Sequence, residues 1–351
     1  MAFNRLNSAR NRAGFTLVEI LIVIVIIGLL AGMTTTVVVS ARRSVNNSVI
    51  TTQMAQLSMA LDEYKNRYGE YPPDLSDQKA VERHIRKRWP RYGVSYDQFL
   101  NHVHYGCLLS SQDWNKGDSL SDLSALSDCG RYDWILADAT GPVGSYVSSL
   151  VFWLGGLPGK DGVPRGFYAS PTCPLGISKD DKPIGRPARA KREEPLFAFE
   201  KKTIGAFMVS TDAVGNVGLE RVEDVAPDPS TGLYQFIPGF CQGDYPVLYF
   251  RPTSGNGYET KTVGFIAEGL YSCAKPYAQY YENGLPLWFE DKRFQLVHPG
   301  ADGLFDTVDS GVVYDRTAVR TVKQEPRNVS PADADNLTNF LENGTLESLY
   351  E

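Results

Sequence analysis

The stretch that decides the fold runs from residue 10 to residue 33 and reads RNRAGFTLVEILIVIVIIGLLAGM. From Phe15 to Met33 it holds 19 residues and one charged side chain, that of Glu19. A run of about 18 or more apolar residues predicts a membrane-spanning helix. A carboxylate at the centre of such a helix costs about 2.5–3.5 kcal/mol on insertion scales. Glu19 lies near the start of the run, and its presence still predicts a polar partner.

The residues before the apolar run predict its orientation and its processing. Arg5, Arg10 and Arg12 precede it, and basic residues beside a membrane segment favour the cytoplasmic side. The small residues Ala13 and Gly14 also come before the run, whereas a secretory signal has its small-residue cleavage site after the apolar core. Cleavage at this point would remove the basic leader and leave the apolar helix on the mature protein.

The sequence Gly14-Phe15-Thr16-Leu17-Val18-Glu19 resembles the class III signal of type IV pilins and of type II secretion pseudopilins. The resemblance implies that a prepilin peptidase cleaves after Gly14 and methylates the new N-terminal residue, Phe15. It also implies that Glu19 acts in assembly, by pairing with the Phe15 amine of an adjacent subunit. A plain single-pass anchor is the alternative. It explains the hydrophobicity, but neither Glu19 nor the position of Gly14.

Composition limits the classes of function. The chain has 351 residues, of which 42% are hydrophobic and 22% charged, as in a folded protein with a large core. Its net charge of −6 becomes −9 when the three arginines of residues 1–14 are removed, and an acidic body argues against nucleic-acid binding. Five dispersed cysteines without a CxxC pair argue against a zinc cluster. The sequence leaves open whether disulfides form, for example between Cys107 and Cys129 or between Cys241 and Cys273.

The apolar helix is expected to continue into an amphipathic one. Ile50, Met54, Leu57, Leu61, Tyr64 and Tyr68 recur at spacings of three and four residues, which predicts one helical stripe that packs into a core. Gly69 and the pair Pro72-Pro73 would end the helix. We therefore expect one helix from about residue 15 to residue 67, with a break near Gly28, Gly32 or residues 34–36 as an alternative.

These patterns predict an α+β fold of the type IV pilin-like kind, with a long N-terminal helix packed against an antiparallel sheet. Short aromatic runs between Gly, Pro, Asn and Asp turns predict the strands from residue 196 onward. The predicted organisation is a leader at 1–14, a long helix at 15–68, an enlarged periplasmic domain with insertions at 69–293 and a C-terminal block at 294–351. Residues 15–39 of the helix would lie in the membrane or in the fibre core.

Three central segments carry local predictions. Residues 81–89, VERHIRKRW, predict a short basic helix, which is either a solvated helix face or a contact with acidic lipid headgroups. His102, His104 and Cys107 would share one face of a strand and could ligate a metal, although no fourth ligand is evident. Residues 277–287 predict a loop with exposed aromatic side chains, a candidate surface for neighbouring subunits.

The C-terminal block is rich in aspartates at turns. Carboxylates and backbone carbonyls gathered by turns suit Ca²⁺, which takes 6–8 oxygen ligands, although the spacing here is not that of an EF-hand. The segments 300–303 and 332–340 resemble the C-terminal calcium loop of the major pseudopilin. In contrast to that loop, an insertion from Leu304 to Pro331 separates the two halves, and residues 76–293 have no counterpart. The matching positions are Asp302, Asp333 and Asp335, with Asp306 and Asp309 as competing ligands.

The predicted function is therefore structural: a subunit of a type II secretion pseudopilus that polymerises from the inner membrane and binds calcium. The N-terminus would be cytoplasmic and the C-terminal domain periplasmic. Partners would be prepilin peptidase, other pseudopilins and the inner-membrane assembly platform. Alternatives are a type IV pilin for adhesion, motility or DNA uptake, a minor tip pseudopilin, and a glycan-binding domain or enzyme on a pilin-like stalk. Because no catalytic signature appears, we expect no enzyme.

Overall fold

The computed structural model describes residues 16–75, 77–111, 145–184, 190–205, 207–211, 217–221, 235–238, 245–253, 257–258, 263–267, 270–282, 285–300, 303–307, 320–321, 335–341 and 345–346. The chain divides into two compact units, Met1–Val45 and Asn46–Glu351. Helix α1 belongs to both units, because its first part lies before this boundary and its second part after it.

The predicted long helix is present as α1, which spans the 52 residues Leu17–Tyr68 without interruption at Gly28 or Gly32. Gly69 ends it. The φ angle of Gly69 is 78°, in the left-handed region that glycine adopts without steric cost, and its N–H donates to the Lys65 carbonyl at 2.6 Å. The prolines that follow cannot continue a helix.

In the first unit, α1 has an exposed apolar surface. All described side chains from Leu17 to Gly32 are exposed, and the large aliphatic ones between Leu17 and Leu30 are 47–81% exposed. Contiguous apolar surface of this size normally marks a contact with another protein or with a membrane. Within the part of the chain that the structure describes, no helix combines the length and the hydropathy that a membrane crossing requires.

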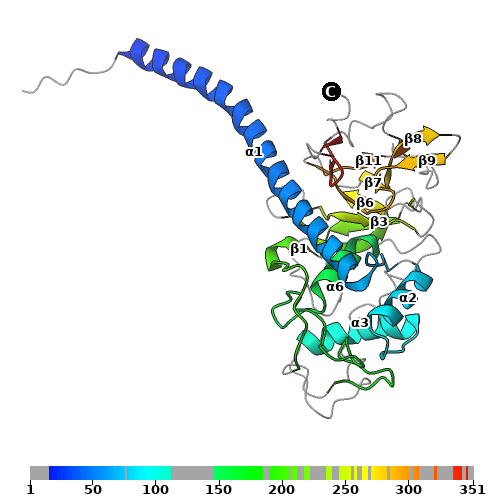
Figure 1. Ribbon diagram of the computed structural model, residues 1–351. Helices are drawn as coiled ribbons and strands as arrows, with labels where there is room; N and C mark the ends of the chain where they lie inside the picture. Colours follow the sequence, from blue (N-terminus) through cyan, green and yellow to red (C-terminus); the bar gives the residue numbers. More distant parts are fainter. Residues whose placement is uncertain are drawn as a thin grey trace, which may run out of the picture. The chain divides into compact units, whose positions relative to one another are not determined.

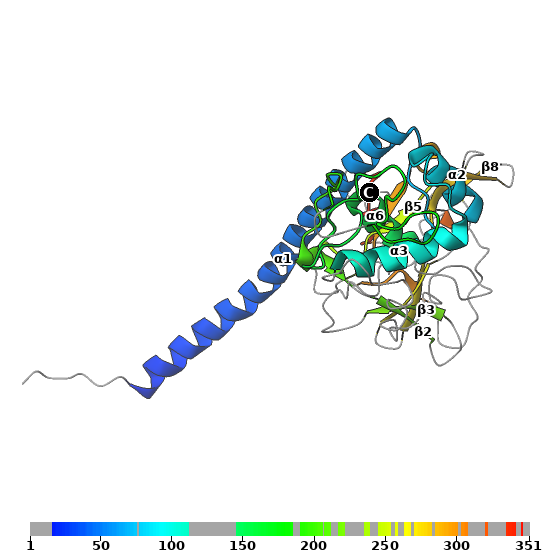
Figure 2. The ribbon, with the colours of Figure 1, turned by 90° about the horizontal axis from the view of Figure 1, so that it is seen from below.

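In the second unit, the predicted stripe of α1 is buried in the main core. Ile50, Met54, Leu57, Leu61 and Tyr64 are each at most 1% exposed. Three further helices share this core, and Figures 1 and 2 show them gathered beside the second part of α1. They are α2 (Gln78–Arg88), α3 (Tyr96–Ser111) and α6 (Ser145–Gly155).

Helix α6 lies at the centre of this core. Leu150 to Leu154 are all buried, because these five consecutive apolar residues, LVFWL, cover every side of the helix. Trp153 stacks on Phe99 of α3 with ring centroids 6.0 Å apart, and on Trp89 at 6.1 Å. Its indole N–H donates to the Pro73 carbonyl at 2.8 Å, which fixes the turn after α1 against α6.

One small antiparallel sheet separates the main core from a second one. It has the order β13-β10-β5, formed by Leu337–Thr338, Gln295–His298 and Leu248–Phe250. Tyr249 and Leu296 face the main core, whereas Phe250 and Val297 face the second. Because successive side chains of a strand point to opposite faces of the sheet, β10 and β5 supply side chains to both cores.

The remaining strands form three other sheets. A five-stranded sheet has the order β11-β7-β6-β3-β2, formed by Asp306–Thr307, Leu270–Ala274, Val263–Ala267, Val217–Arg221 and Phe207–Thr211. A three-stranded sheet has the order β12-β8-β9, formed by Arg320–Thr321, Tyr277–Glu282 and Leu285–Trp288. In the third, β1 (Ile204–Gly205) pairs with β4 (Gln235–Phe236). The pairs β3–β6 and β8–β12 are parallel, and the other named pairs are antiparallel. The predicted α+β class is confirmed, with several small sheets where one was expected. A 3₁₀ turn, η2 (Lys201–Thr203), precedes β1.

Two local predictions are wrong. Residues 277–282 and 285–288 form the paired strands β8 and β9, where a loop was expected over 277–287, and Tyr277 is 1% exposed. His102, His104 and Cys107 lie on helix α3, where a strand was expected, because Phe99, Leu100 and Val103 bury one helical face. Cys173 is a free thiol, and the side chains of the other four cysteines lie outside the described residues, so the two disulfides stay predictions.

The stripe of α1 yields a direct stability test. We expect Leu61→Ala to lower the free energy of unfolding by about 2–5 kcal/mol, because it opens a cavity at a fully buried position. Met59, on the same helix, is 65% exposed, so Met59→Ala serves as the matched control and should change stability by less than about 0.5 kcal/mol. Denaturant unfolding of the full chain measures both. Equal losses would contradict the assignment of this face to the core.

Candidate functional site

The first site is the start of α1, where Glu19 closes a capping box with Thr16. The backbone N–H and the hydroxyl of Thr16 both donate to Oε2 of Glu19 at 2.9 Å. In return, the backbone N–H of Glu19 donates to Oγ1 of Thr16 at 3.2 Å. This reciprocal pairing satisfies N–H groups that have no partner within the first turn of a helix. A carboxylate is also favourable there because the helix N-terminus carries partial positive charge.

The capping box gives Glu19 a local role that the sequence analysis missed. The signal was available, because Thr16-x-x-Glu19 before an apolar run is the pattern of a capping box. Glu19 is exposed, so its carboxylate is accessible to a cation of another molecule. Thr16 is therefore the residue that competes with such a partner. Gly14 and Phe15, the predicted processing residues, lie outside the described residues.

Comparison with known proteins identifies this segment. Residues 9–35 match the family model of the prokaryotic N-terminal methylation motif. No curated protein and no solved structure shows a significant match to the chain. The match covers residues 9–14 of the predicted leader, the predicted cleavage point, Glu19 and the apolar run. It indicates a type IV pilin-like signal, and thus a substrate of prepilin peptidase.

The second site is the predicted calcium loop. In the antiparallel pair β10–β13, His298 is opposite Leu337, so the chain after β10 and the chain before β13 leave at the same end. Gly300 and Asp335 lie in contact there. A Cβ on Gly300 would collide with the backbone oxygen and the carboxyl group of Asp335, and the φ angle of Gly300 is 68°. Only glycine fits this position without strain.

The other predicted ligands are only partly placed. Asp302, Asp309 and Asp333 lie outside the described residues. Asp306 begins β11 and is opposite Cys273 of β7, so its backbone belongs to the five-stranded sheet. Among the described residues, no group of three or more His, Cys, Asp or Glu side chains could hold a metal ion. Calcium binding therefore stays a prediction, and the contact between Gly300 and Asp335 is the observation that fits it.

Two side-chain amides, one half-buried and one buried, join β10 to the segment after β13 and to β8. The Asn339 side chain accepts from the Leu296 N–H at 2.7 Å and donates to the Phe294 carbonyl at 3.3 Å. Gln295, fully buried, donates to the carbonyls of Tyr277 and Phe289 and accepts from the Tyr277 N–H. These hydrogen bonds satisfy backbone N–H and C=O groups at the edges of β10 and β8. Residue 339 belongs to the segment 332–340, which resembles part of the calcium loop of the major pseudopilin.

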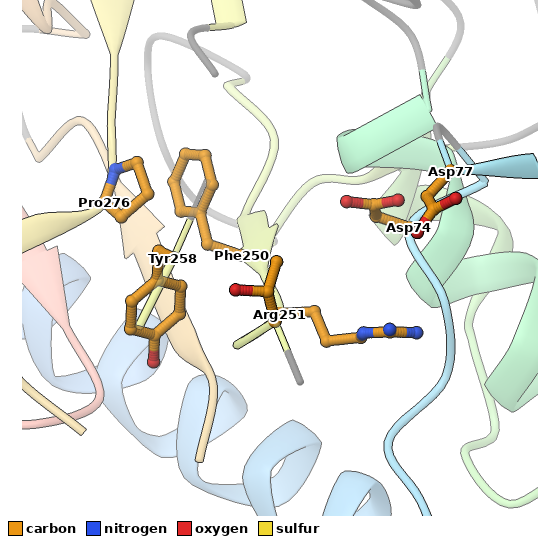
Figure 3. A pocket seen from close by; sticks show the side chains of 7 residues that line it. Asp74, Asp77, Phe250, Arg251, Tyr258 and Pro276 are labelled. Atoms are coloured by element: carbon orange, nitrogen blue, oxygen red, sulfur yellow. The ribbon is translucent and has the colours of Figure 1, made fainter. Parts of the chain in front are cut away.

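A hollow open to solvent lies between the turn after α1 and the end of β5. Figure 3 shows Asp74 and Asp77 on one side, Phe250, Tyr258 and Pro276 on the other, and Arg251 between them. Asp77 caps α2 by accepting from the Lys79 N–H at 3.0 Å, and the Tyr258 hydroxyl donates to the Glu290 carbonyl at 2.6 Å. These polar groups stabilise the fold, and we assign the hollow no ligand.

A buried hydrogen-bonded chain joins α1 to α2. Arg88 donates to the Tyr64 hydroxyl at 2.9 Å, that hydroxyl lies 2.6 Å from Nε2 of His84, and Nδ1 of His84 lies 2.8 Å from Glu70. The geometry fits a neutral imidazole that accepts from Tyr64 and donates to Glu70. Arg88 is 4% exposed, and its guanidinium lies 4.4 Å from the ring centroid of Tyr68, a cation–π contact.

A second chain of the same type joins α3 to the loop at residue 181. The Tyr92 hydroxyl and Nδ1 of His102 are hydrogen-bonded, and Nε2 of His102 lies 2.7 Å from Asp181. His102 is 1% exposed and Tyr92 is fully buried. Because both nitrogens of His102 already have partners, its predicted role as a metal ligand is not supported by this geometry. Both histidines hold packed elements together.

These histidines predict a pH-dependent stability. Burial lowers the pKa of His84, against the opposing effect of Glu70, and burial likewise lowers the pKa of His102 against that of Asp181. Arg88 and Arg251 also disfavour protonation of His84. The unfolded chain then binds more protons than the folded one below about pH 6.5, so stability is complete above that pH and is lost as the pH falls.

We therefore expect the free energy of unfolding of the full chain to decrease between pH 7.5 and pH 5. His84→Gln keeps hydrogen-bonding capacity and cannot titrate in this range. It should be less stable at pH 7.5 and should show a smaller pH slope. The remaining slope is due to His102 and to His298, whose pKa burial lowers to about 3. Denaturant titrations across this range measure the slope. A His84→Gln slope as steep as that of the wild type would refute the account.

Proposed function

We propose that the chain is a structural, non-catalytic subunit of a type II secretion pseudopilus. The match of residues 9–35 to the N-terminal methylation motif carries the proposal, since it predicts processing by prepilin peptidase. The exposed apolar side chains of α1 from Leu17 to Leu30 support it, because they need a covering environment. In this account the membrane covers them before assembly, and the helices of neighbouring subunits cover them in the fibre.

Glu19 would set the register between subunits. Once Gly14 is removed, the chain begins with the amine of Phe15, and methylation keeps that amine basic. A carboxylate from one subunit that meets this amine on the next forms an ion pair among apolar helices. Such a pair is far stronger than one in water, and removing one member leaves an unpaired buried charge. The contact joins different surfaces of two copies, so it builds a filament.

The pseudopilus is favoured over a pilin by the C-terminal block. The contact of Gly300 with Asp335 brings together the two halves of the predicted calcium loop. Asp335, Asp302 and Asp333 would supply carboxylate oxygens to the ion, which suits the preference of Ca²⁺ for oxygen ligands. Bound calcium would neutralise these carboxylates and make the loop rigid. The acidic domain would then face the periplasm, where the fibre supports protein export with other pseudopilins and the inner-membrane assembly platform.

The roles of Glu19 in capping and in pairing can be separated by three variants. Glu19→Leu removes both, Glu19→Gln keeps an acceptor for the capping box but no charge, and Thr16→Val breaks the box but keeps the charge. We expect both Glu19 variants to be cleaved normally yet to form at least about tenfold fewer multimers, because an ion pair in an apolar core is lost. Thr16→Val should assemble nearly as well as the wild type.

Cross-linking of intact cells measures multimers, and the culture medium reports secretion. The proposal requires that secretion decreases together with assembly. If secretion is normal and motility or adhesion is lost instead, the chain is a type IV pilin. If Glu19→Gln assembles like the wild type, the carboxylate acts only as a cap and the pairing account is wrong.

Calcium should stabilise the full chain through Asp335. At a concentration 100 times its dissociation constant, a ligand that binds only the folded state adds about 2.7 kcal/mol. We expect the melting temperature to rise with calcium and to fall on chelation, and we expect Asp335→Ala to abolish this dependence. Asp291, exposed in the turn before β10, provides the control, so Asp291→Ala should keep it. A melting temperature insensitive to calcium in the wild-type chain would exclude the site.

A further inference from the structure

The exposed face of α2 carries a strip of basic side chains with few acidic partners in the fold. Ala80, Val81, His84 and Ile85 are buried on one face of this helix. The opposite face is exposed and follows the helical spacing of three and four residues. Figures 1 and 2 both show α2 at the edge of the second unit. We call these residues the basic strip: Lys79, Arg83, Arg86 and Lys87 of α2, and Arg91 just beyond it.

Little in the described structure neutralises the basic strip. Arg83 lies 3.8 Å from Glu70 and Arg86 lies 3.6 Å from Glu82, and both basic side chains are more than half exposed. Exposed ion pairs of this kind contribute little to the stability of the fold. Among the described residues, Lys79, Lys87 and Arg91 have no ion pair within 4 Å.

The helix dipole does not account for the strip. Basic side chains near a helix C-terminus are favourable, which suits Arg86 and Lys87. Lys79, however, lies in the first turn, where the partial charge of the helix is positive and a cation is unfavourable. Arg83 lies in the middle, outside the reach of either end. A strip that runs the whole length of α2 therefore needs another explanation.

We propose that the basic strip binds the carboxylate-bearing surface of a second copy of this chain. Residues 79–91 carry six basic side chains and one acidic side chain, a net charge of +5, within a chain of net charge −6. The rest of the chain therefore carries −11. Copies with such a surplus of carboxylates repel one another. A contact between the strip of one copy and the carboxylates of the next relieves this repulsion and orients the two copies.

The geometry favours a protein partner over a lipid surface. A helix that lies on a membrane inserts an apolar face beneath its basic one. Here the apolar face of α2 is already buried in the protein core, and the neighbouring aromatic residues Trp89 and Tyr92 are at most 5% exposed. No apolar group of the described strip is left to enter a bilayer. The contact rests on the proposed function, because assembly supplies neighbouring copies at high local concentration.

The first experiment places a photo-cross-linking amino acid at position 86 of the full chain in its native membrane. We expect adducts of two copies of the chain, and we expect fewer of them at high salt because exposed charges are screened. The same amino acid at Lys292, an exposed residue in the turn before β10, is the matched control and should give fewer such adducts. Adducts with lipid, or none above the control, would overturn the proposal.

The second experiment reverses charge. The triple variant Lys79→Glu, Arg86→Glu and Arg91→Glu should lower multimer yield at least about tenfold, since several weak pairs act together. The triple variant Lys191→Glu, Lys201→Glu and Lys292→Glu changes the net charge by the same amount at exposed sites. It should lower the multimer yield less than about twofold. If both triple variants lose multimers to the same extent, the proposed contact of the basic strip is wrong.

Glu19→Leu separates the two proposals. If it abolishes multimers while the strip variant matches its control, the proposed function stands and the strip contact fails. If the wild-type chain forms no multimers in cells, the proposed function itself fails.

Discussion

A single helix has to satisfy two environments, and the rest of the molecule depends on how it does so. Over its first part α1 exposes large aliphatic side chains, and over its second part it buries a stripe from Ile50 to Tyr64. Burial of the stripe organises the main core, in which α2, α3 and α6 pack. The exposed part contributes nothing to that core. It gains stability only when lipid or other copies of the helix cover it.

Glu19, the charged residue at the start of α1, also has two environments to satisfy. In the isolated chain, Glu19 is held by Thr16 through a capping box, so its carboxylate is already satisfied. In the proposed fibre, assembly would exchange this set of hydrogen bonds for an ion pair in a drier environment. The exchange is favourable only if the partner amine is well placed, because two desolvated charges repay their dehydration only in good geometry. The proposed register between subunits follows from this requirement.

The periodic parts of the chain could be predicted from the sequence. The apolar run and the stripe gave the extent of α1 because both patterns persist over many residues. Residues 96–111 and 145–155 were harder, since short apolar runs fit a strand and a helix equally well, and tertiary packing decided for α3 and α6. The separation of the strands into small sheets depends on pairings such as His298 with Leu337, which no local pattern encodes. Likewise, Gly300 and Asp335 meet only because β10 and β13 pair.

The central claim is that the mature chain begins at a processed and methylated residue, Phe15, just before α1. Intact-mass and peptide mass spectrometry of the chain purified from native membranes tests this most directly. The account predicts a mature chain that lacks residues 1–14, begins at Phe15 and carries one methyl group on the Phe15 amine. A chain that keeps its leader, or one cleaved after the apolar run, would contradict it.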